Sequence, residues 1–541
     1  MTSKTRFKKN NVNDILNNRR RSKMKRSQTT VTLKRSLSGL ICLFVFLISP
    51  AIGLAETPNV IVIFVDDLGY GDLSCYGATH VETPHIDRLA TEGRMFTDAH
   101  SASAVCTPSR YALLTGEYPF RQGDGGVWGP LSHTSGLIID TNKLTLGRLF
   151  QEEGYATACV GKWHLGFGEA PCDWNAPLRP GPLELGFDYY FGVPKVNSGF
   201  PYVYVENDRI VGWDPEDPLV FRGSPISPTP EYPEKTPNGF AGAVEAHKLY
   251  DDERTGTILT EKAIDWIQDN KDDPFFLYFA TTNIHHPFTP APQFQGTSDC
   301  GRYGDFIHEL DWMVGQLLTT LDEEGLTDDT LVVFTSDNGG MYNDGGKDAW
   351  ASGHRMNGDL LGFKFGAWEG GHRVPFLVRW PGRVEAGTGS DQLISSIDLL
   401  GTMADLLDRE LTSDQAVDSF NIMDAMTGEP EESIRDHLIH APRDQENLAF
   451  RQGEWVYIGA QGDGGQSLRV RGGPQAVAHS GSVNSDVGEN GRIKVEAPQQ
   501  QLYNLNDDPS QRTNIIRQHP ELADWMQTQL DELRAQPRTR P

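Results

Sequence analysis

Three short runs of mostly apolar residues stand out from the hydrophobic and polar pattern of the chain, at 58–65, 273–280 and 330–335. Because nearly every position is apolar and many side chains are β-branched or aromatic, each run predicts a strand buried on both faces. Amphipathic stretches at 257–270 and 303–324 predict helices between these strands. Strands that alternate with helices predict an α/β fold with a large, mixed, mostly parallel sheet sandwiched by helices.

Two other parts of the chain show a different pattern. Residues 170–240 are rich in Pro, Gly and aromatic residues, which predicts long ordered loops that shape a pocket. From about residue 410 the signals become short and mixed. This change predicts a smaller C-terminal α+β domain with an antiparallel sheet at 410–541, after a main domain at 56–409. The elements expected there are strands at 450–458 and 501–505, a loop at 459–491 and a helix at 520–535.

The first 55 residues have the composition of a leader. Residues 1–36 contain twelve Lys or Arg residues and one acid, and residues 40–48 are all apolar. This order predicts a secretory signal peptide at 1–55, cleaved after Ala55, and a secreted or periplasmic protein. The apolar run is too short for an ordinary transmembrane helix, so we expect no stable membrane insertion. An uncleaved N-terminal anchor and a start at Met24 are the alternatives.

Charge and cysteine content narrow the function further. The 541 residues carry a formal net charge of −26, and a protein this acidic is a poor candidate for binding nucleic acid. Of six cysteines, Cys42 lies in the predicted signal peptide, and none shows the C-x-x-C spacing of a zinc site. Besides Cys106, four remain, which allows up to two disulfides in an oxidising compartment without fixing their pairing. These four are Cys75, Cys159, Cys172 and Cys300.

Acidic and amide side chains follow two of the predicted strands. Asp66 and Asp67 come directly after the first strand, and Asp337 and Asn338 after the third. The carboxyl ends of parallel strands meet at one edge of a sheet, where open α/β sheets place their sites. Oxygen ligands of this kind suit Ca²⁺ or Mg²⁺. The alternative is helix capping and turn formation, which Asp and Asn also favour.

A cysteine begins another predicted element. In Cys106-Thr-Pro-Ser-Arg110, Pro108 suits the first turn of a helix. Cys106 would then lie at a helix N-terminus, where backbone N–H groups favour an anion, and Arg110 would lie one turn further on the same face. The residues alone leave two alternatives open, a reactive thiol and a buried structural cysteine.

Two longer motifs contain these residues. The segment Ala104-Val-Cys-Thr-Pro-Ser-Arg-Tyr-Ala-Leu-Leu-Thr-Gly116 resembles the first signature of the formylglycine-dependent sulfatases, and Gly154-Tyr-Ala-Thr-Ala-Cys-Val-Gly-Lys-Trp-His-Leu-Gly166 resembles the second. The resemblance runs from about Pro58 to the last predicted helix. It implies an alkaline-phosphatase-like fold and an arylsulfatase-like sulfuric ester hydrolase.

The resemblance implies a covalent modification of Cys106. In this family a formylglycine-generating or equivalent maturase oxidises the cysteine to Cα-formylglycine (3-oxoalanine). The hydrated aldehyde attacks the sulfur of a sulfate ester, the alcohol leaves, and release of sulfate restores the aldehyde. The ion implied is Ca²⁺, with Mg²⁺ as the alternative. The metal ligands implied are Asp66, Asp67, the modified Cys106, Asp337 and Asn338.

Further catalytic roles follow from the same resemblance. Arg110 would support the formylglycine, and His164 would contact its diol. Lys162 and Lys364 would bind the sulfate. His285 would contact the substrate and protonate the leaving alcohol.

Several nearby positions leave alternatives open. His286, beside His285, is the alternative acid. We expect loop packing rather than catalysis for His247, His354 and His372. Phe363 and Phe365 flank Lys364 where relatives carry small glycines, which leaves the pose of this lysine open. The pair Asp66-Asp67 stands where some relatives have three aspartates.

The expected function is hydrolysis of sulfate esters, releasing sulfate from a sulfated polysaccharide or oligosaccharide. A phosphoester or phosphonate monoester hydrolase of the same superfamily is the nearest alternative, because related folds hydrolyse such esters. A non-catalytic protein that binds sulfated glycans is a third reading.

Overall fold

The strand predicted at 58–65 is β1 (Asn59–Val65), which lies inside a ten-stranded sheet. The computed structural model describes residues 57–541 except 124, 222–239 and 466–472, and Glu56–Pro541 form one compact unit. The predicted signal peptide, with Met24 and Cys42, lies outside the described residues. The domain boundary at residue 409 stays a prediction.

The sheet is mostly parallel, as the sequence predicts. The order is β13-β2-β12-β11-β1-β10-β4-β5-β6-β7, and the run from β11 to β5 is parallel throughout. β12 is antiparallel to both of its neighbours, and β6 and β7 add an antiparallel edge. The other bounds are β2 (Arg94–Phe96), β4 (Ala156–Gly161), β5 (Tyr189–Gly192), β6 (Val205–Glu206), β7 (Arg209–Ile210), β10 (Phe275–Ala280), β11 (Thr330–Ser336), β12 (Phe376–Arg379) and β13 (Thr388–Ser390).

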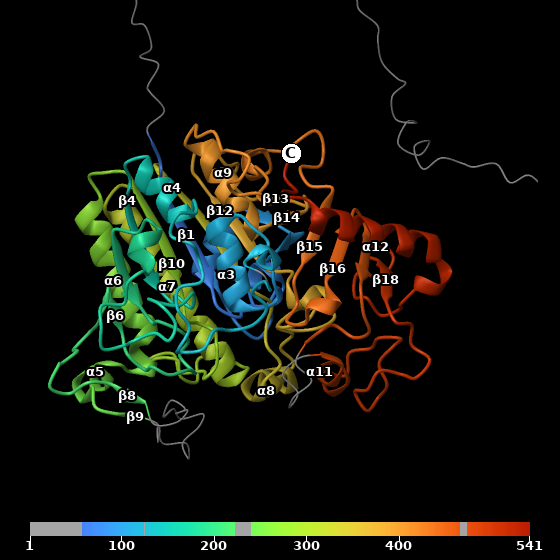
Figure 1. The fold of residues 1–541 in the computed structure, drawn as a ribbon, viewed down its shortest axis with the longest axis horizontal. Coiled ribbons are helices and arrows are strands. Elements are labelled where there is room, and N and C mark those ends of the chain that lie inside the picture. The colour runs from blue at the N-terminus through green and yellow to red at the C-terminus, as the bar shows by residue number, and fades with distance from the viewer. Residues whose placement is uncertain (1–56, 124, 222–239, 466–472) are drawn as a thin grey trace, which may run out of the picture. The chain divides into compact units, whose positions relative to one another are not determined.

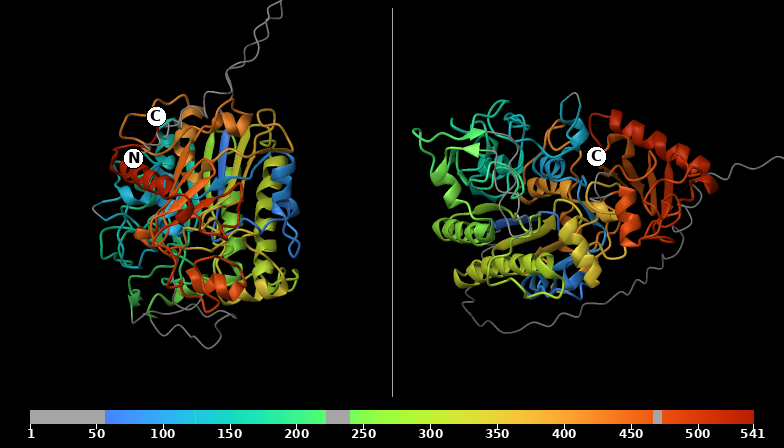
Figure 2. Two further views of the ribbon diagram at one scale, coloured as in Figure 1. Left: turned by 90° about the vertical axis from the view of Figure 1, so that its right-hand side faces the viewer. Right: turned by 90° about the horizontal axis from the view of Figure 1, so that it is seen from below.

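Alternating side chains of β1 enter two different cores, because successive residues of a strand face opposite sides of the sheet. Val60, Val62 and Phe64 pack into a core shared with one set of helices. Ile61 and Ile63 pack into a core shared with another set. Figure 2 shows the resulting helix–sheet–helix layers. The first set is α3 (Cys106–Thr115), α4 (Leu146–Glu152) and α9 (Leu399–Leu406), and the second is α2 (Pro84–Thr91), α6 (Thr255–Asn270) and α7 (Gly301–Glu323).

A separate four-stranded antiparallel sheet lies toward the C-terminus, beside α3 in Figure 1. Its order is β15-β16-β17-β18, and α12 packs on it. Ala112 of α3 belongs to the core of this sheet, whereas Leu113 and Leu114 belong to the core of the main sheet. All ten residues of α3 are therefore buried. The bounds are β15 (His437–His440), β16 (Ala449–Gln452), β17 (Trp455–Ile458), β18 (Gln501–Asn504) and α12 (Pro520–Ala535).

Three sequence predictions need correction. The strand predicted at 450–458 is a hairpin, β16 and β17, because Gly453 adopts a positive φ of 56° and reverses the chain. The loop predicted at 459–491 contains α11 (Gly473–Ser480), whose Ala476 and Val477 are buried. The loop predicted at 170–240 contributes β5, β6 and β7 to the main sheet; residues 222–239 and 466–472 of these segments lie outside the described residues.

The remaining short elements lie around these sheets. β3 (Ala99–His100) pairs with β14 (Ile394–Ser395), and β8 (Val220–Phe221) with β9 (Phe240–Ala241). Three further short α-helices are α5 (Val244–Leu249), α8 (Asp344–Ser352) and α10 (Met423–Thr427).

Within the described part of the chain, no disulfide joins the cysteines, and no helix is both long and apolar enough to cross a bilayer. Cys159 packs in the core on one face of the main sheet and Cys300 in the core on the other, so those two cannot meet.

Candidate active site

Four neighbouring parallel strands deliver side chains to one edge of the main sheet. Val65 of β1 pairs with Ser336 of β11, so the residues that follow the two strands emerge together. Gly161 of β4 pairs with Ala280 of β10 in the same way. The side chains that follow these strands therefore converge, as predicted for the carboxyl ends of parallel strands. They are Asp66, Asp67, Lys162, His164, His285, Asp337 and Asn338.

The three carboxylates form a tight buried group. One oxygen from each of Asp66, Asp67 and Asp337 lies within 4.8 Å of the others. Burial, with the charge of Asp66 second, raises the pKa of Asp337. Asp67 Oδ2 and Asn338 Oδ1 are buried and accept no hydrogen bond. Unsatisfied oxygens beside a carboxylate cluster fit a hard divalent cation, which the four predicted ligands Asp66, Asp67, Asp337 and Asn338 would hold.

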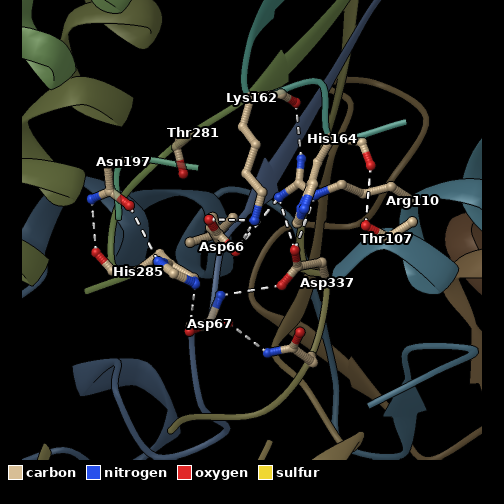
Figure 3. Close-up of polar contacts among 12 residues, drawn as sticks. Asp66, Asp67, Thr107, Arg110, Lys162, His164, Asn197, Thr281, His285 and Asp337 are labelled. Atoms are coloured by element: carbon tan, nitrogen blue, oxygen red, sulfur yellow. Dashed lines mark hydrogen bonds and ion pairs between the residues drawn. The ribbon is translucent and has the colours of Figure 1, made fainter. Parts of the chain in front are cut away.

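Three cations neutralise these carboxylates, and Figure 3 shows two of them, Arg110 and Lys162. Arg110 donates from Nη2 to Asp337 Oδ2 at 2.8 Å and from Nη1 to the carbonyl of Lys162 at 3.1 Å. The ammonium of Lys162 lies 2.7 Å from both oxygens of Asp66. Lys364 donates to Asp67 Oδ1. Although burial opposes its charge, the nearby carboxylates, Asp67 foremost, raise the pKa of Lys364.

Cys106 is the first residue of α3, and Val105 before it is extended. No side chain caps this helix start, so its first N–H groups point to the space around Cys106, where they favour an anion. Cys106 is only 2% exposed. Burial raises the pKa of its thiol, even though Lys162 and Lys364 oppose the shift. An unmodified Cys106 is therefore a neutral thiol at pH 7 and a weak nucleophile.

His285 is held by Asn197. Its Nδ1 lies 2.6 Å from the carbonyl oxygen of His286 and 3.2 Å from Asn197 Oδ1, while Asn197 Nδ2 donates to the His285 carbonyl at 2.9 Å. Two acceptors at Nδ1 place the proton of the neutral ring there and turn Nε2 toward the carboxylates, 3.8 Å from Asp67 Oδ2. Burial, then the charge of Lys364, holds the pKa of His285 well below its usual value.

Of the other histidines that the sequence analysis considered, two line the cavity over Cys106, and three do not. His164 is buried beside Lys162 with both ring nitrogens unpaired, and burial, then Lys162, lowers its pKa well below normal. His286 stacks on His285 with ring centroids 4.4 Å apart. His354 does not line that cavity, and its Nε2 lies 2.7 Å from the carboxylate of Asp72. The remaining two do not line the cavity described below: His372 contacts His100 and His440, and His247 stacks on Phe200.

A cavity of about 440 Å³ opens over Cys106, and it includes two cations that the sequence motifs did not indicate. Lys195 follows β5, and Arg443 follows β15; neither has an ion-pair partner among the described residues. Both belong to segments without a periodic hydrophobic pattern, so the sequence alone could not place them at the cavity, and only the tertiary structure shows them there. The described residues that line the cavity are Cys106, Pro130, Leu131, Ser132, His164, Lys195, Val196, Ser198, Gly199, His285, His286, Met341, Lys364, Phe365 and Arg443.

Comparisons with known proteins agree with this geometry. The family model described as Sulfatase matches residues 58–409. An N-acetylgalactosamine-6-O-sulfatase of Bacteroides thetaiotaomicron is 38% identical over 493 residues, covering 87% of this chain and 91% of its own. Steryl-sulfatase of Rattus norvegicus is 34% identical over 422 residues, covering 71% of this chain and 72% of its own.

A solved structure shows the same fold. It is a sulfatase from the same Bacteroides species, determined in work on the metabolism of multiple glycosaminoglycans, and it superposes with a TM-score of 0.78 at 37% identity. The match covers 89% of this chain and all of that one (100%). The family match spans more than half of the chain and includes the residues that converge on Cys106. The chain therefore belongs to the sulfatase family of sulfuric ester hydrolases, within the alkaline-phosphatase-like superfamily.

Proposed function

We propose that this protein releases sulfate from a sulfated polysaccharide or its oligosaccharides, with a formylglycine derived from Cys106 as the nucleophile. The observation that carries the proposal is the position of Cys106. It begins a buried helix, faces a cavity large enough for a sugar, and lies near two carboxylates, Asp66 and Asp337, and two lysines, Lys162 and Lys364. The N-acetylgalactosamine-6-O-sulfatase among the relatives supports a sugar as substrate.

We assign two roles to the residues of the site: some stabilise negative charge, and others transfer protons. A divalent cation, held by Asp66, Asp67, Asp337 and Asn338, would supply positive charge next to the nucleophile and the sulfate. Ca²⁺ is proposed, with Mg²⁺ as the alternative. Lys162 and Lys364 place further positive charge where the transferred sulfuryl group develops negative charge. The modified Cys106 would supply the attacking oxygen from its hydrated aldehyde.

Proton transfer falls to the histidines. His285 is oriented by Asn197 so that Nε2 faces the carboxylates at the cavity. The negative charge of a bound sulfate ester would favour uptake of a second proton at Nε2, which would then pass to the departing alcohol oxygen. The alcohol would leave with that proton as the diol oxygen binds sulfur. The C–O bond to that oxygen would then break, so that sulfate leaves with it, the remaining hydroxyl loses its proton to restore the aldehyde, and water hydrates the aldehyde again. Arg110 holds Asp337 by two contacts and keeps the group of carboxylates in place.

Mass spectrometry and a matched pair of variants test this proposal. The peptide that contains residue 106 should have lost sulfur and gained oxygen in enzyme from a host with a maturase. Cys106→Ala should lose at least about 1000-fold in kcat/KM for 4-nitrophenyl sulfate and for N-acetylgalactosamine 6-sulfate, since the nucleophile is gone. Cys75→Ala, a half-buried cysteine outside the cavity, is the control. Near-normal sulfate release by Cys106→Ala, or faster turnover of 4-nitrophenyl phosphate or a phenylphosphonate, would refute it.

We also propose export of the protein through the signal predicted at 1–55. The basic and apolar segments of the leader support it. Sequencing the N-terminus of protein recovered from the periplasm or medium should give Glu56 as the first residue. Recovery of an intact leader in the membrane fraction would favour the uncleaved anchor.

A further inference from the structure

The positive charge of the cavity exceeds what one sulfate ester needs. Within the catalytic group the three carboxylates are matched by Arg110, Lys162 and Lys364. The two charges of a divalent cation are then balanced by an ionised nucleophile and one sulfate monoester. Lys195 and Arg443 remain as additional cations that line the same cavity.

No carboxylate neutralises these two cations. The described lining of the cavity contains no Asp or Glu, although the whole chain carries a net charge of −26. Among the described residues no acid lies within ion-pair distance of Lys195 or Arg443, whereas the buried Lys162 and Lys364 each bind a carboxylate. Cations left without partners in a cavity of an acidic protein are arranged to meet negative charge on a ligand.

The main chain fixes both positions. The segment before Lys195 lies along the loop that follows β4, because the amides of Trp163 and His164 donate to the carbonyls of Val193 and Pro194 at 3.0 and 3.2 Å. Lys195 therefore lies near His164, and it interacts electrostatically with Cys106 and Lys162.

Phe365 links Arg443 to the surroundings of the nucleophile. It belongs to one buried cluster with Cys106, and the guanidinium carbon of Arg443 lies 5.8 Å from its ring centroid. The amide of Arg443 donates to the carbonyl of Phe365 at 2.9 Å. Phe365 itself has a positive φ of 82°, which is unusual for a bulky residue. A hydrogen bond from its N–H to the carbonyl oxygen of Ala104, at 2.8 Å, helps to hold this conformation. One aromatic ring from Cys106, Arg443 is placed for a group other than the sulfate under attack.

We propose that Lys195 and Arg443 form an anion-binding subsite for a second negative group of the substrate. The substrate is then a sugar that carries another sulfate, or that is joined to a uronic acid. The hydroxyls of Ser132 and Ser198, which also line the cavity, suit a sugar at this place. This inference rests on the proposed sulfatase function and adds a substrate class to it.

Three substrates and three variants test the subsite. The substrates are N-acetylgalactosamine 6-sulfate, N-acetylgalactosamine 4,6-disulfate, and a disaccharide of glucuronate and N-acetylgalactosamine 6-sulfate. The variants are Lys195→Met, Arg443→Met and the control Lys248→Met, an exposed lysine outside the cavity. The quantity compared is the ratio of kcat/KM for a doubly charged substrate to that for the singly charged one.

Wild-type enzyme should prefer at least one doubly charged substrate by about 10-fold or more, and each cavity variant should lower that ratio about 10-fold, as expected for loss of one charge-assisted hydrogen bond. Lys248→Met should leave the ratio unchanged. The substrate whose ratio falls identifies the second group as sulfate or carboxylate. A wild-type ratio near one for both, or a ratio within about twofold of wild type in both cavity variants, would overturn the subsite.

A binding experiment separates this inference from the catalytic proposal. In the Cys106→Ala background, calorimetric titration with the same three sugars should show the same 10-fold differences in Kd, and Lys195→Met or Arg443→Met should remove them. If wild-type enzyme released no sulfate from any sugar, the proposed function would fail, yet these Kd ratios would still decide the subsite. Equal Kd values for the three sugars would refute it.

Discussion

His285 and His286 are neighbours with different surroundings. Nδ1 of His285 is held by two oxygens, and its Nε2 faces the carboxylates. His285→Gln should lower kcat/KM for N-acetylgalactosamine 6-sulfate by about 100-fold or more, because a sugar alkoxide needs a proton to leave. The loss for 4-nitrophenyl sulfate should be much smaller, since nitrophenolate leaves unprotonated.

His286→Gln is the matched comparison for this prediction. Its effect should be similar on the two substrates, because the proposed proton donor is His285, on which the ring of His286 stacks. If His286→Gln rather than His285→Gln showed the dependence on the leaving group, the assignment of the two residues would be reversed.

The unsatisfied oxygens of Asp67 and Asn338 predict a response to metal. After treatment with EDTA, addition of Ca²⁺ should raise the Tm of the wild type, since a ligand at 100 times its Kd stabilises the folded state by about 2.7 kcal/mol. Asp67→Asn should lose most of this rise, and Asp328→Asn, at an exposed carboxylate, should keep it. Differential scanning calorimetry measures the Tm values. A rise in Tm for Asp67→Asn equal to that of the wild type would contradict a metal at this place.

How well the sequence predicted individual residues depended on their setting. Asp66, Asp67, Asp337 and Asn338 follow strands with an unmistakable apolar pattern, so their convergence could be foreseen. Asn197, Lys195 and Arg443 lie in irregular segments, and only the tertiary fold brings them to Cys106. Local patterns carry no information about contacts of that kind.

At the scale of elements, α3 depends on a glycine at its end. Gly116 caps the helix with φ 65°, and an added Cβ would lie 2.8 Å from Cβ of Ala416. Gly116→Ala should therefore lower the free energy of unfolding by about 2–4 kcal/mol, from backbone strain and overpacking together.

Gly77 provides the control for this substitution, since it caps a short helix with φ 99° and an added Cβ would meet nothing within 4 Å. Gly77→Ala should cost about 1–2 kcal/mol, the strain alone. Urea unfolding measures both values. Equal losses in the two variants would show that packing around α3 does not matter.

Elements with a strong apolar pattern were predictable, and short ones were not. β1, β10 and β11 are buried along their whole length, and their sequences show it. β16 and β17 form one apolar run in the sequence, because the two-residue turn between them is too short to interrupt the pattern. α11 has few apolar positions, and its burial comes from neighbours far along the chain.

For the whole molecule, a buried histidine cluster should govern stability in acid. His100 of β3, His440 of β15 and His372 form this cluster, and the charged residues around it are Asp98, Glu369, Arg373 and Arg451. Burial lowers the pKa of His372 to about 3. Since the unfolded residue has a pKa near 6.5, the stability that the neutral ring contributes is complete above that pH and is lost as the pH falls toward 3.

Comparison with a variant isolates this effect from other titrating groups. Between pH 7 and pH 5 wild type should lose about 2 kcal/mol more stability than His372→Gln, from the linkage of His372 alone. His85→Gln, at an exposed histidine, should follow the wild type. Urea unfolding at the two pH values gives the difference, and identical pH dependence in wild type and His372→Gln would contradict the prediction.

The complete burial of α3 has a consequence for biosynthesis. The core that covers Ala112 includes Leu438, Phe450, Leu502 and Met526, which leave the ribosome long after Cys106. Once those residues have packed, an enzyme that must reach Cys106 finds it 2% exposed. The oxidation of Cys106 that we propose would therefore have to come before the C-terminal sheet closes, and folded protein made without a maturase would stay inactive when the maturase is added later.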